Sequence, residues 1–386
     1  MRRCVVVVQY NTLVSHPPTM SLLLSLQSLG RDVYSISVDH PAARRFVEEH
    51  NIPASFFPSD WLPQKTKGWF ARVVSVLWRA TRFYSKRLAL KKILAELQSK
   101  YDELELWFQE VNSAALLGND YVRYPRRALT LFEIDDVYGC KWWGFDFERF
   151  MRTTVIVVPE YNRSFIVECI YHLTERPLVL TNKPANHPRK SKIPLSEELE
   201  QVFRGVGSRP VFLYQGVWGG DRDGVGRILE VIAKNRPQYA VMSLPDSAEA
   251  RQRLGKYENA FLLPYIPAPG HLAVTSRATV GIAVYGGGSA PLYRLNALYC
   301  APNKIFEYAG FGVPTLGNDI PGLKYSIEAN GAGVCCELTD ESILNAADLL
   351  ISNIDKYRQG ASAFFEKTNT NHEVSAILSR MERDSK

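Results

Sequence analysis

The sequence predicts an α/β protein of two doubly wound domains, each with a parallel sheet that carries helices on both faces. Short apolar runs alternate with segments of helical period along the chain, as in folds built from β–α–β units. The chain has 386 residues, which is enough for two hydrophobic cores. A polar stretch with three prolines, "TNKPANHPRKSKIP" at 181–194, interrupts the alternation and is typical of a linker.

Apolar runs predict the strands of the first half, because a strand that is covered on both faces is continuously apolar. Between the first two runs, residues 18–29 have helical period and end before Gly30, and glycine commonly terminates a helix. We therefore expect a helix there. The expected strands of this half are residues 4–8, 33–38, 104–108, 128–132, 155–158 and 178–181.

The alternation restarts after the linker, which favours a second sheet of the same kind. Two such sheets would face a cleft, and ligands of doubly wound sheets bind at the carboxyl ends of the strands. The expected strands of the second half are residues 211–214, 239–243, 260–263, 280–284 and 313–317. The expected helices are residues 225–234, 271–278 and 303–309.

Composition points to a globular protein in a reducing compartment. The chain is 46% hydrophobic and 22% charged, which are ordinary values. Its six cysteines form no CxxC pair and no Cys/His group with zinc spacing, so we expect reduced thiols. The valine run in "MRRCVVVVQY" is too short for the core of a signal peptide, and no apolar run could span a bilayer. We expect a cytoplasmic protein that could also rest on the inner membrane.

Positive charge is concentrated in one segment. Between Trp61 and Lys100 the chain has ten basic residues and one acidic residue, Glu96, a net charge of +9 against +6 for the whole chain. Apolar residues recur there at helical spacing, with basic residues mostly on the other side, which indicates a basic amphipathic helix. The apolar set is Phe70, Val73, Val74, Leu77, Trp78, Thr81 and Tyr84, and the basic set is Arg72, Arg79, Arg82 and Lys86.

Two interpretations of this helix remain open. The aromatic residues could belong to the core and the charges to a solvated face. Alternatively, residues 65–92 could bind an anionic membrane surface, which attracts Lys and Arg. No nucleic-acid-binding module accompanies the segment, so we expect no nucleic acid partner.

The stretch "APNKIFEYAGFGVPTLGNDIPG" at 301–322 carries the strongest functional signal. It predicts a strand that ends in a Pro-Asn turn, a short helix and a second strand. The start of a helix attracts anions, and Lys304 adds positive charge there. Glu307 lies one turn on, where its carboxylate could accept two hydrogen bonds from a ribose. The simpler interpretation, a surface ion pair between Lys304 and Glu307, stays open.

This segment resembles the donor site of GT-B glycosyltransferases, in the large bacterial retaining family related to sucrose and mannosyl transferases. Many members carry Pro-Asn-Lys-(x)-x-Glu-Tyr-(x)-x-x-Gly-x-Pro at this place. "TERPLVLTNKP" is similar to the end of their first domain, and "RPVFLYQGVWGGDRDGVGRILEVI" is similar to the start of their second. The last helix, after His372, resembles the tail that crosses back to the first domain.

The resemblance implies two Rossmann-like domains: an acceptor domain at 1–185, which includes the basic helical segment 65–100, and a donor domain at 186–370. Residues 371–386 would form the helix that returns to the first domain. Glu307 would bind the donor ribose, and Pro302, Asn303 and Lys304 would hold the diphosphate and sugar. The glycine-rich residues Gly287, Gly288 and Ser289 would let the backbone approach the donor.

Two positions depart from the family pattern. In "GVWGGDRDG", Gly216 matches, but Val217 stands where an arginine is expected, and Arg222 could take its place. The family often has a second glutamate that would fall at Tyr299. The contact with the donor sugar is therefore absent or supplied by another group, and neither the sugar nor the stereochemical outcome follows from the sequence.

A catalytic base is expected at the strand ends of the first domain. A base must lie within hydrogen-bond reach of the attacking hydroxyl. Each of these side chains could instead cap a helix or lie in an ordinary loop. The candidates are His16, Glu110, Glu133, Asp135, Asp136 and Glu160.

The sequence thus predicts a hexosyltransferase-like enzyme that moves a sugar from a nucleotide-diphosphate donor to a glycan or a lipid-linked acceptor. The resemblance suggests a role in bacterial surface polysaccharide biosynthesis. We expect no metal and no cofactor, since positive groups at the donor site could stabilise the leaving diphosphate. A nucleotide-sugar epimerase of the same fold and a non-catalytic sugar-nucleotide-binding protein are the alternatives.

Overall fold

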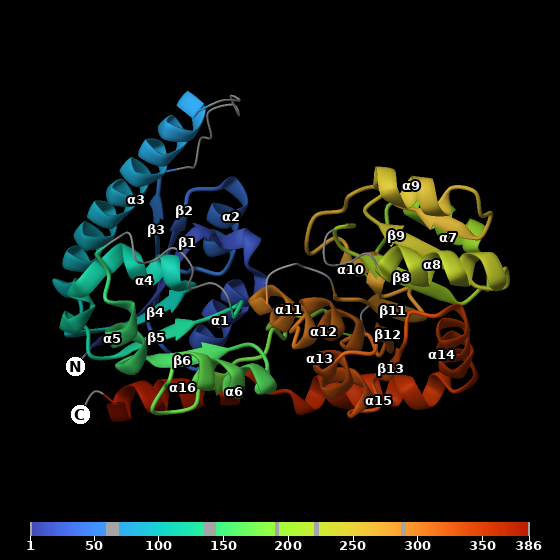
Figure 1. Ribbon diagram of the computed structural model, residues 1–386. Coiled ribbons are helices and arrows are strands. Elements are labelled where there is room, and N and C mark those ends of the chain that lie inside the picture. Colours follow the sequence, from blue (N-terminus) through green and yellow to red (C-terminus); the bar gives the residue numbers. More distant parts are fainter. Residues whose placement is uncertain are drawn as a thin grey trace. The chain divides into compact units, whose positions relative to one another are not determined.

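The structure is a computed structural model that describes residues 2–58, 69–134, 144–189, 193–219, 224–286 and 291–384. The chain forms two compact units, shown in Figure 1. Unit 1 comprises Met1–Thr181 together with Thr370–Lys386, and unit 2 comprises Asn182–Asn369. The divisions expected from the sequence were 185/186 and 370/371.

Within the described residues, unit 1 contains a seven-stranded parallel sheet in the order β3-β2-β1-β4-β5-β6-β7. The chain starts in the middle of the sheet, builds one side and then crosses over to build the other. The strands are β1 (Arg3–Thr12), β2 (Val33–Val38), β3 (Ala54–Phe57), β4 (Glu103–Gln109), β5 (Arg127–Thr130), β6 (Val155–Val158) and β7 (Leu178–Val179). The helices are α1 (Pro17–Ser28), α2 (Pro41–Glu49), α3 (Trp69–Gln98), α4 (Val111–Leu117), α5 (Phe147–Arg152), α6 (Tyr161–Ile170) and α16 (Thr370–Asp384).

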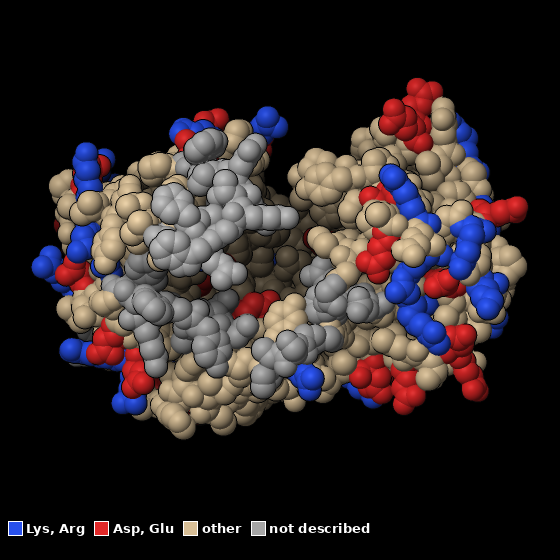
Figure 2. All heavy atoms as spheres, turned by 45° about the horizontal axis from the view of Figure 1, so that its top comes forward, with Lys and Arg blue, Asp and Glu red and all other residues tan. Residues whose placement is uncertain are grey.

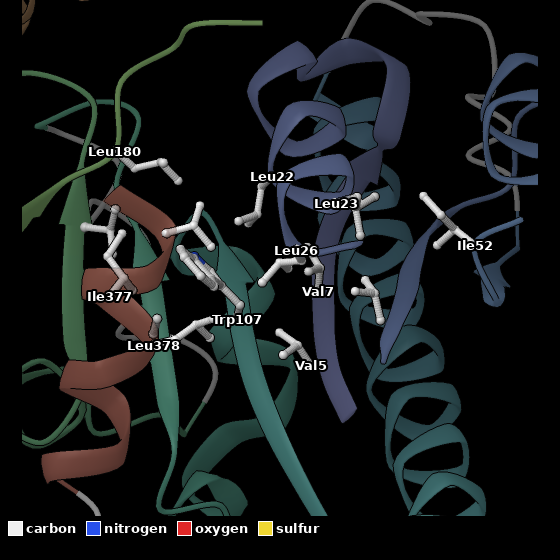
Figure 3. Close-up of a cluster of buried hydrophobic side chains, with 14 of the residues drawn as sticks. Val5, Val7, Leu22, Leu23, Leu26, Ile52, Trp107, Leu180, Ile377 and Leu378 are labelled. Atoms are coloured by element: carbon white, nitrogen blue, oxygen red, sulfur yellow. The ribbon is translucent and has the colours of Figure 1, made fainter. Parts of the chain in front are cut away.

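The C-terminal helix α16 completes one side of the unit 1 core, as Figure 3 shows. Side chains alternate between the two faces of a strand, so Val5, Val7 and Trp107 point to the same face of the sheet. Ile377 and Leu378 of α16 pack there with Leu residues of α1. The returning helix predicted from the sequence is therefore confirmed as an integral part of unit 1.

The described part of unit 2 repeats this plan with a six-stranded parallel sheet in the order β10-β9-β8-β11-β12-β13. The strands are β8 (Val211–Gln215), β9 (Ala240–Leu244), β10 (Ala260–Leu262), β11 (Val280–Ala283), β12 (Thr315–Asn318) and β13 (Gly333–Cys336). The helices are α7 (Glu197–Val206), α8 (Gly224–Asn235), α9 (Ala248–Leu254), α10 (Leu272–Thr275), α11 (Pro291–Leu298), α12 (Asn303–Ala309), α13 (Pro321–Leu323), α14 (Asp340–Ser352) and α15 (Ile354–Lys367).

The predicted α/β architecture with parallel sheets is confirmed, and the differences concern short elements. β3 and β13 were not predicted, because "ASFF" and "GVCC" lie at sheet edges and lack a continuous run of large apolar residues. The helix expected over 271–278 is only the short α10. The strand expected just before Pro302 is wrong, because the helix α11 precedes that turn.

Helix α3 differs from a simple surface helix, because the face that it exposes to solvent carries large apolar side chains. Figure 1 shows its N-terminal half extending past the strands of unit 1. Phe83, Leu90 and Leu94 are buried against the sheet. The opposite face presents a row of large apolar side chains to solvent. The exposed fractions are 42% for Val74, 60% for Leu77, 49% for Tyr84 and 69% for Leu88.

The interpretation that places these apolar residues in the core is therefore wrong for the described side chains, which begin at Val74. Figure 2 shows charged side chains of both signs on the described surface of each unit. None of the helices in the described ranges is long and apolar enough to cross a membrane.

Lys86 is the basic residue of α3 whose position the sequence pattern misjudged. It was expected on a solvated face, but its side chain is buried. Its Nζ atom donates to the Tyr10 carbonyl at 3.0 Å and lies 4.1 Å from the centroid of the Tyr10 ring. Burial and the nearby Arg82 lower the pKa of Lys86 to about 7. The amine thereby ties α3 to the end of β1.

This burial predicts a pH-dependent stability. The pKa of Lys86 is about 7 in the folded protein and about 10.4 in an unfolded chain. Between these values the unfolded state binds more protons, so the free energy of unfolding should rise with pH by up to about 1.4 kcal/mol per pH unit. In urea denaturation at about pH 7.5 and about pH 9.5, Lys86→Met should reduce this rise, whereas Lys92→Met on the exposed face should not. Equal pH dependence in the wild type and Lys86→Met would contradict the prediction.

Candidate functional site

Candidate residues gather at the carboxyl edge of each sheet. In unit 1 the order of strands changes direction between β1 and β4, and in unit 2 between β8 and β11. Loops that leave adjacent strands at such a point diverge, which leaves room for a ligand. The residues that follow β1, β4 and β8 are therefore considered in turn.

In unit 1 the structure brings together two of the predicted catalytic residues, His16 and Glu110. His16 follows β1 and precedes α1, whereas Glu110 follows β4 and precedes α4. The two strands are neighbours, with Gln9 opposite Gln109. As a result, His16 Nε2 lies 2.5 Å from Glu110 Oε1, and both side chains are only partly exposed.

Neighbouring groups hold this pair in place. Asn11 Nδ2 donates to the other carboxylate oxygen of Glu110 at 3.3 Å. Ser113 Oγ accepts from the Tyr10 amide at 2.8 Å, which links the start of α4 to β1. Glu110 itself has φ +67°, a conformation that costs about 1–3 kcal/mol for a non-glycine residue and concentrates at functional sites.

A polar layer lies directly beneath the pair. The Thr19 hydroxyl donates to Gln9 Oε1 at 3.0 Å, and Gln109 Nε2 donates to Thr130 Oγ1 at 3.3 Å. All four side chains are buried. Buried polar groups that are hydrogen-bonded fix a unique geometry, so the strand ends under His16 form a rigid base.

The arrangement can transfer a proton. A neutral imidazole that donates from Nε2 to the Glu110 carboxylate has its lone pair on Nδ1. Nδ1 lies 2.8 Å from the Ser15 hydroxyl and 3.4 Å from Gln9 Nε2. A bound hydroxyl that replaced these two contacts could give its proton to Nδ1, while Glu110 stabilises the resulting imidazolium.

In unit 2 the Glu307 carboxylate is held by the end of β8 and the start of α10. Gln215 Nε2 donates to Glu307 Oε2 at 2.5 Å. The Thr275 hydroxyl donates to Gln215 Oε1 at 2.6 Å, which orients the amide. His271 Nε2 lies 3.4 Å from the same Oε2. These contacts with described side chains all fall on Oε2, so Oε1 is the oxygen that can accept from a ligand.

The interpretation of Lys304 and Glu307 as a surface ion pair is wrong. Lys304 is buried, and its Nζ atom lies 4.5 Å from the centroid of the Tyr214 ring and 5.7 Å from that of Tyr285. A Cβ atom at Gly216 would lie 3.0 Å from this Nζ. The ammonium group therefore lies beside the loop that follows β8, while Glu307 turns towards His271.

Gly216 is required by both its conformation and its surroundings. Its φ of +144° is rarely adopted by other residues, and the space where a side chain would begin is taken by Lys304 and the Tyr214 hydroxyl. The Tyr214 hydroxyl donates to the Val217 carbonyl at 2.7 Å. The loop after β8 thus packs tightly against the Lys304 amine.

Residues 181–194, which were expected to be a linker, support the helix α12 that carries Glu307. Arg189 N donates to His187 Nδ1 at 2.8 Å, so the His187 proton is on Nε2, which donates to the Glu307 carbonyl at 3.0 Å. Burial lowers the pKa of His187 and favours this neutral form. A Cβ atom at Gly310 would overlap the imidazole ring, so glycine there lets the histidine approach α12.

The other predicted donor residues occupy structural positions at the start of α12. Pro302 is the residue before the helix, and Asn303 is its first residue. The Ala301 carbonyl accepts from Asn182 at 2.7 Å. Tyr299 is half-buried at the end of α11, where its backbone packs closely against Gly322.

Two further catalytic candidates of unit 1, Glu133 and Glu160, have structural roles. Glu160 caps α6 by accepting from Arg163 N at 2.9 Å, and burial raises the pKa of this carboxyl. The exposed Glu133 carboxylate lies 3.4 Å from the guanidinium of Arg163, which is buried. Six predicted residues lie outside the described ranges: Asp135, Asp136, Arg222, Gly287, Gly288 and Ser289.

Several residues that shape the two sites were not predicted. Gln215 gave a signal, because it is a polar residue at the end of an otherwise apolar strand. Thr275 and His271 gave none, since their contact with Glu307 depends on how α10 packs. Among the described residues, no group of three or more His, Cys, Asp or Glu side chains could hold a metal ion.

No protein-family model and no curated protein matches the chain, but solved structures do. A Rickettsia africae glycosyltransferase aligns with a TM-score of 0.67 and 13% identity over 99% of this chain and 98% of its own. Anabaena HepE in complex with UDP-glucose aligns with a TM-score of 0.63 and 13% identity over 99% of each chain. A Listeria monocytogenes protein assigned as a UDP-N-acetylglucosamine 2-epimerase has a TM-score of 0.63 and 13% identity, over 99% and 97%. The chain therefore has the GT-B fold, as predicted.

Proposed function

We propose that this protein is a glycosyltransferase that uses a nucleotide-diphosphate sugar. The observation that carries the proposal is the Glu307 carboxylate, which is held by Gln215 and His271 at the carboxyl edge of the unit 2 sheet. This is the edge where doubly wound sheets bind nucleotides. The GT-B fold and the UDP-glucose in the Anabaena structure support a donor of the same class.

Each group of the unit 2 site has a role in donor binding. Glu307 Oε1 accepts from a ribose hydroxyl, because Gln215 and His271 both lie at Oε2. The Lys304 amine lies beside Gly216, where the backbone can approach a ligand closely. A positive group at this point stabilises the charge that develops on the leaving diphosphate.

Donor binding tests this assignment. A thermal-shift panel of UDP-, GDP-, ADP- and dTDP-sugars should show stabilisation by one nucleotide class, since a ligand that binds only the folded state raises its stability. Glu307→Ala removes hydrogen bonds to a charged group, each worth about 1.5–3 kcal/mol, and should weaken binding at least about tenfold. Gln215→Met should have a smaller effect in the same direction.

Glu341→Ala, which removes an exposed carboxylate from α14, is the matched control and should bind like the wild type. Absence of a shift with all four nucleotide classes, or equal binding by Glu307→Ala, would contradict the donor site.

In unit 1, the His16–Glu110 pair supplies the base for the acceptor. His16 Nδ1 takes the proton of the acceptor hydroxyl, and the oxygen attacks the anomeric carbon as its bond to the diphosphate breaks. Glu110 keeps the Nε2 proton in place and stabilises the imidazolium. The proton leaves the acceptor, and the electron pair of the broken bond leaves with the nucleoside diphosphate.

Removal of the base should slow the reaction without weakening donor binding. The substrate is the nucleotide sugar that stabilises the protein in the thermal-shift panel, with water as the acceptor. We expect His16→Ala to reduce the rate of nucleoside diphosphate release about 10²–10⁴-fold. Glu110→Gln should fall between this variant and the wild type, because it keeps the side-chain shape but not the charge. Both variants should keep the thermal shift of the donor.

His172→Asn, a change of an exposed histidine in the same unit, should retain full release of nucleoside diphosphate. Wild-type rates in His16→Ala would show that another group is the base.

The similarity to the Listeria monocytogenes protein keeps an epimerase as the second candidate. An epimerase changes the configuration of the sugar without an acceptor. Product analysis of the stabilising donor separates the two reactions: transfer or hydrolysis releases nucleoside diphosphate and free or transferred sugar, whereas epimerisation yields a new sugar nucleotide. Wild-type protein that binds the donor and yields neither product would favour a non-catalytic binding protein.

We also propose that the acceptor is attached to a lipid and that α3 brings the enzyme to the membrane. The exposed row of Val74, Leu77, Tyr84 and Leu88 suits the acyl boundary of a bilayer, and the basic residues of the segment suit anionic headgroups. A lipid-linked acceptor would agree with the suggested role in surface polysaccharide biosynthesis.

Vesicle binding tests the role of α3. The wild type should pellet with vesicles that contain anionic lipid and should be released as salt is raised. Leu77→Ser with Leu88→Ser should weaken binding about tenfold or more, because each exposed leucine contributes about 1.5–3 kcal/mol when fully buried. Leu349→Ser, a change of an exposed leucine in α14, is the control. Equal binding by the double variant and the control would contradict the proposal.

A further inference from the structure

A separate groove in unit 1 lies at the opposite edge of the sheet from His16 and Glu110. Its cavity volume is about 530 Å³, within the range of small-molecule sites. The first residues of three adjacent strands, Arg127 of β5, Val155 of β6 and Leu178 of β7, contribute to its wall. Since these are amino-terminal strand ends, the groove is distinct from the carboxyl-edge site.

The groove has an excess of positive charge. Five arginines and two carboxylates line it, Arg127, Arg149, Arg152, Arg176 and Arg380 with Glu175 and Asp384. Both carboxylates are already engaged by Arg380, which pairs with Glu175 and lies 3.1 Å from Asp384. Arg176 pairs with Glu168 at 3.0 Å.

Arg127 is buried in the groove wall without a carboxylate partner. Its guanidinium donates to Thr154 Oγ1 at 2.9 Å, to the Tyr124 carbonyl at 2.7 Å and to the Thr153 carbonyl at 2.6 Å. These acceptors are neutral. The rings of Tyr121 and Phe150, with centroids 4.9 Å and 6.0 Å from the guanidinium carbon, also face the charge but supply no anionic counterion. Burial of a charge without a counterion is costly.

Arg149 and Arg152 extend this uncompensated charge to the open side of the groove. Both belong to α5 and are exposed. Burial, and to a lesser degree the positive charge of Arg149, lower the pKa of Arg127. Among the described residues, no carboxylate lies within ion-pair distance of Arg127, Arg149 or Arg152.

We propose that this groove is a second ligand site that binds a phosphorylated small molecule through Arg149 and Arg152, with Arg127 as the buried positive charge behind them. The planar guanidinium group donates two parallel hydrogen bonds to a phosphate. The volume exceeds that of a phosphate alone, so the site suits a phosphate ester or a diphosphate. Because it uses the amino-terminal strand ends, its ligand does not compete for His16.

Pyrophosphate serves as the probe, in a thermal-shift titration at constant ionic strength. We expect Arg149→Ala with Arg152→Ala to raise the half-saturating concentration at least about tenfold, since the double variant loses the charge-assisted hydrogen bonds to the probe. Arg45→Ala, a change of an exposed arginine on α2 outside the groove, is the matched control. Lys304→Met should remove any thermal shift that comes from pyrophosphate bound at the unit 2 site and should preserve the shift that comes from the groove. This variant therefore separates the groove from the proposed donor site.

Arginine modification by phenylglyoxal, mapped by peptide mass spectrometry, locates the probe. Pyrophosphate should protect Arg149 and Arg152 and leave Arg45 reactive. The proposal is overturned if the double variant responds to pyrophosphate like the wild type, if the response is lost only in Lys304→Met, or if Arg45 is protected equally, which would indicate ionic screening.

Discussion

Parallel pairing between strands that are distant in the sequence determines where the described candidate residues at the strand ends lie. β1 pairs with β4 although about ninety residues separate them, and β8 pairs with β11 in the same way. Parallel strands place their carboxyl ends at one edge, so His16 meets Glu110 only because Gln9 is in register with Gln109. The chemistry of each site therefore depends on the register of a central strand pair.

The central strands of both sheets could be predicted from the sequence, but the edge strands and the contacts between sheets and helices could not. Runs such as Cys4–Val8 announced buried strands, whereas the edge strands β3 and β13 lack such runs. Glu307 could be foreseen from its motif, but Gln215, Thr275 and His271 could not be joined to it, because the packing of α10 places them together. Periodicity likewise separated the faces of α3 but could not say which one packs, so Lys86 was assigned to solvent.

The two sites treat charge in different ways. In unit 1, the His16 ring and the Glu110 carboxylate rest on buried, fully hydrogen-bonded amides and hydroxyls, which can stabilise a proton on the ring without moving. In unit 2, the Lys304 amine is kept near aromatic faces and glycine backbone. Aromatic faces attract a cation, so these surroundings hold the amine beside the loop that follows β8.

The position of α16 has a consequence for biosynthesis. Unit 2 is one continuous stretch of chain, so it can fold as soon as it leaves the ribosome. Unit 1 needs Ile377 and Leu378 to cover its sheet, and these residues are made after all of unit 2. During translation the apolar face beside Trp107 therefore stays exposed to solvent until some two hundred further residues have been added. Chaperones would be needed in this interval, because exposed apolar surface favours aggregation.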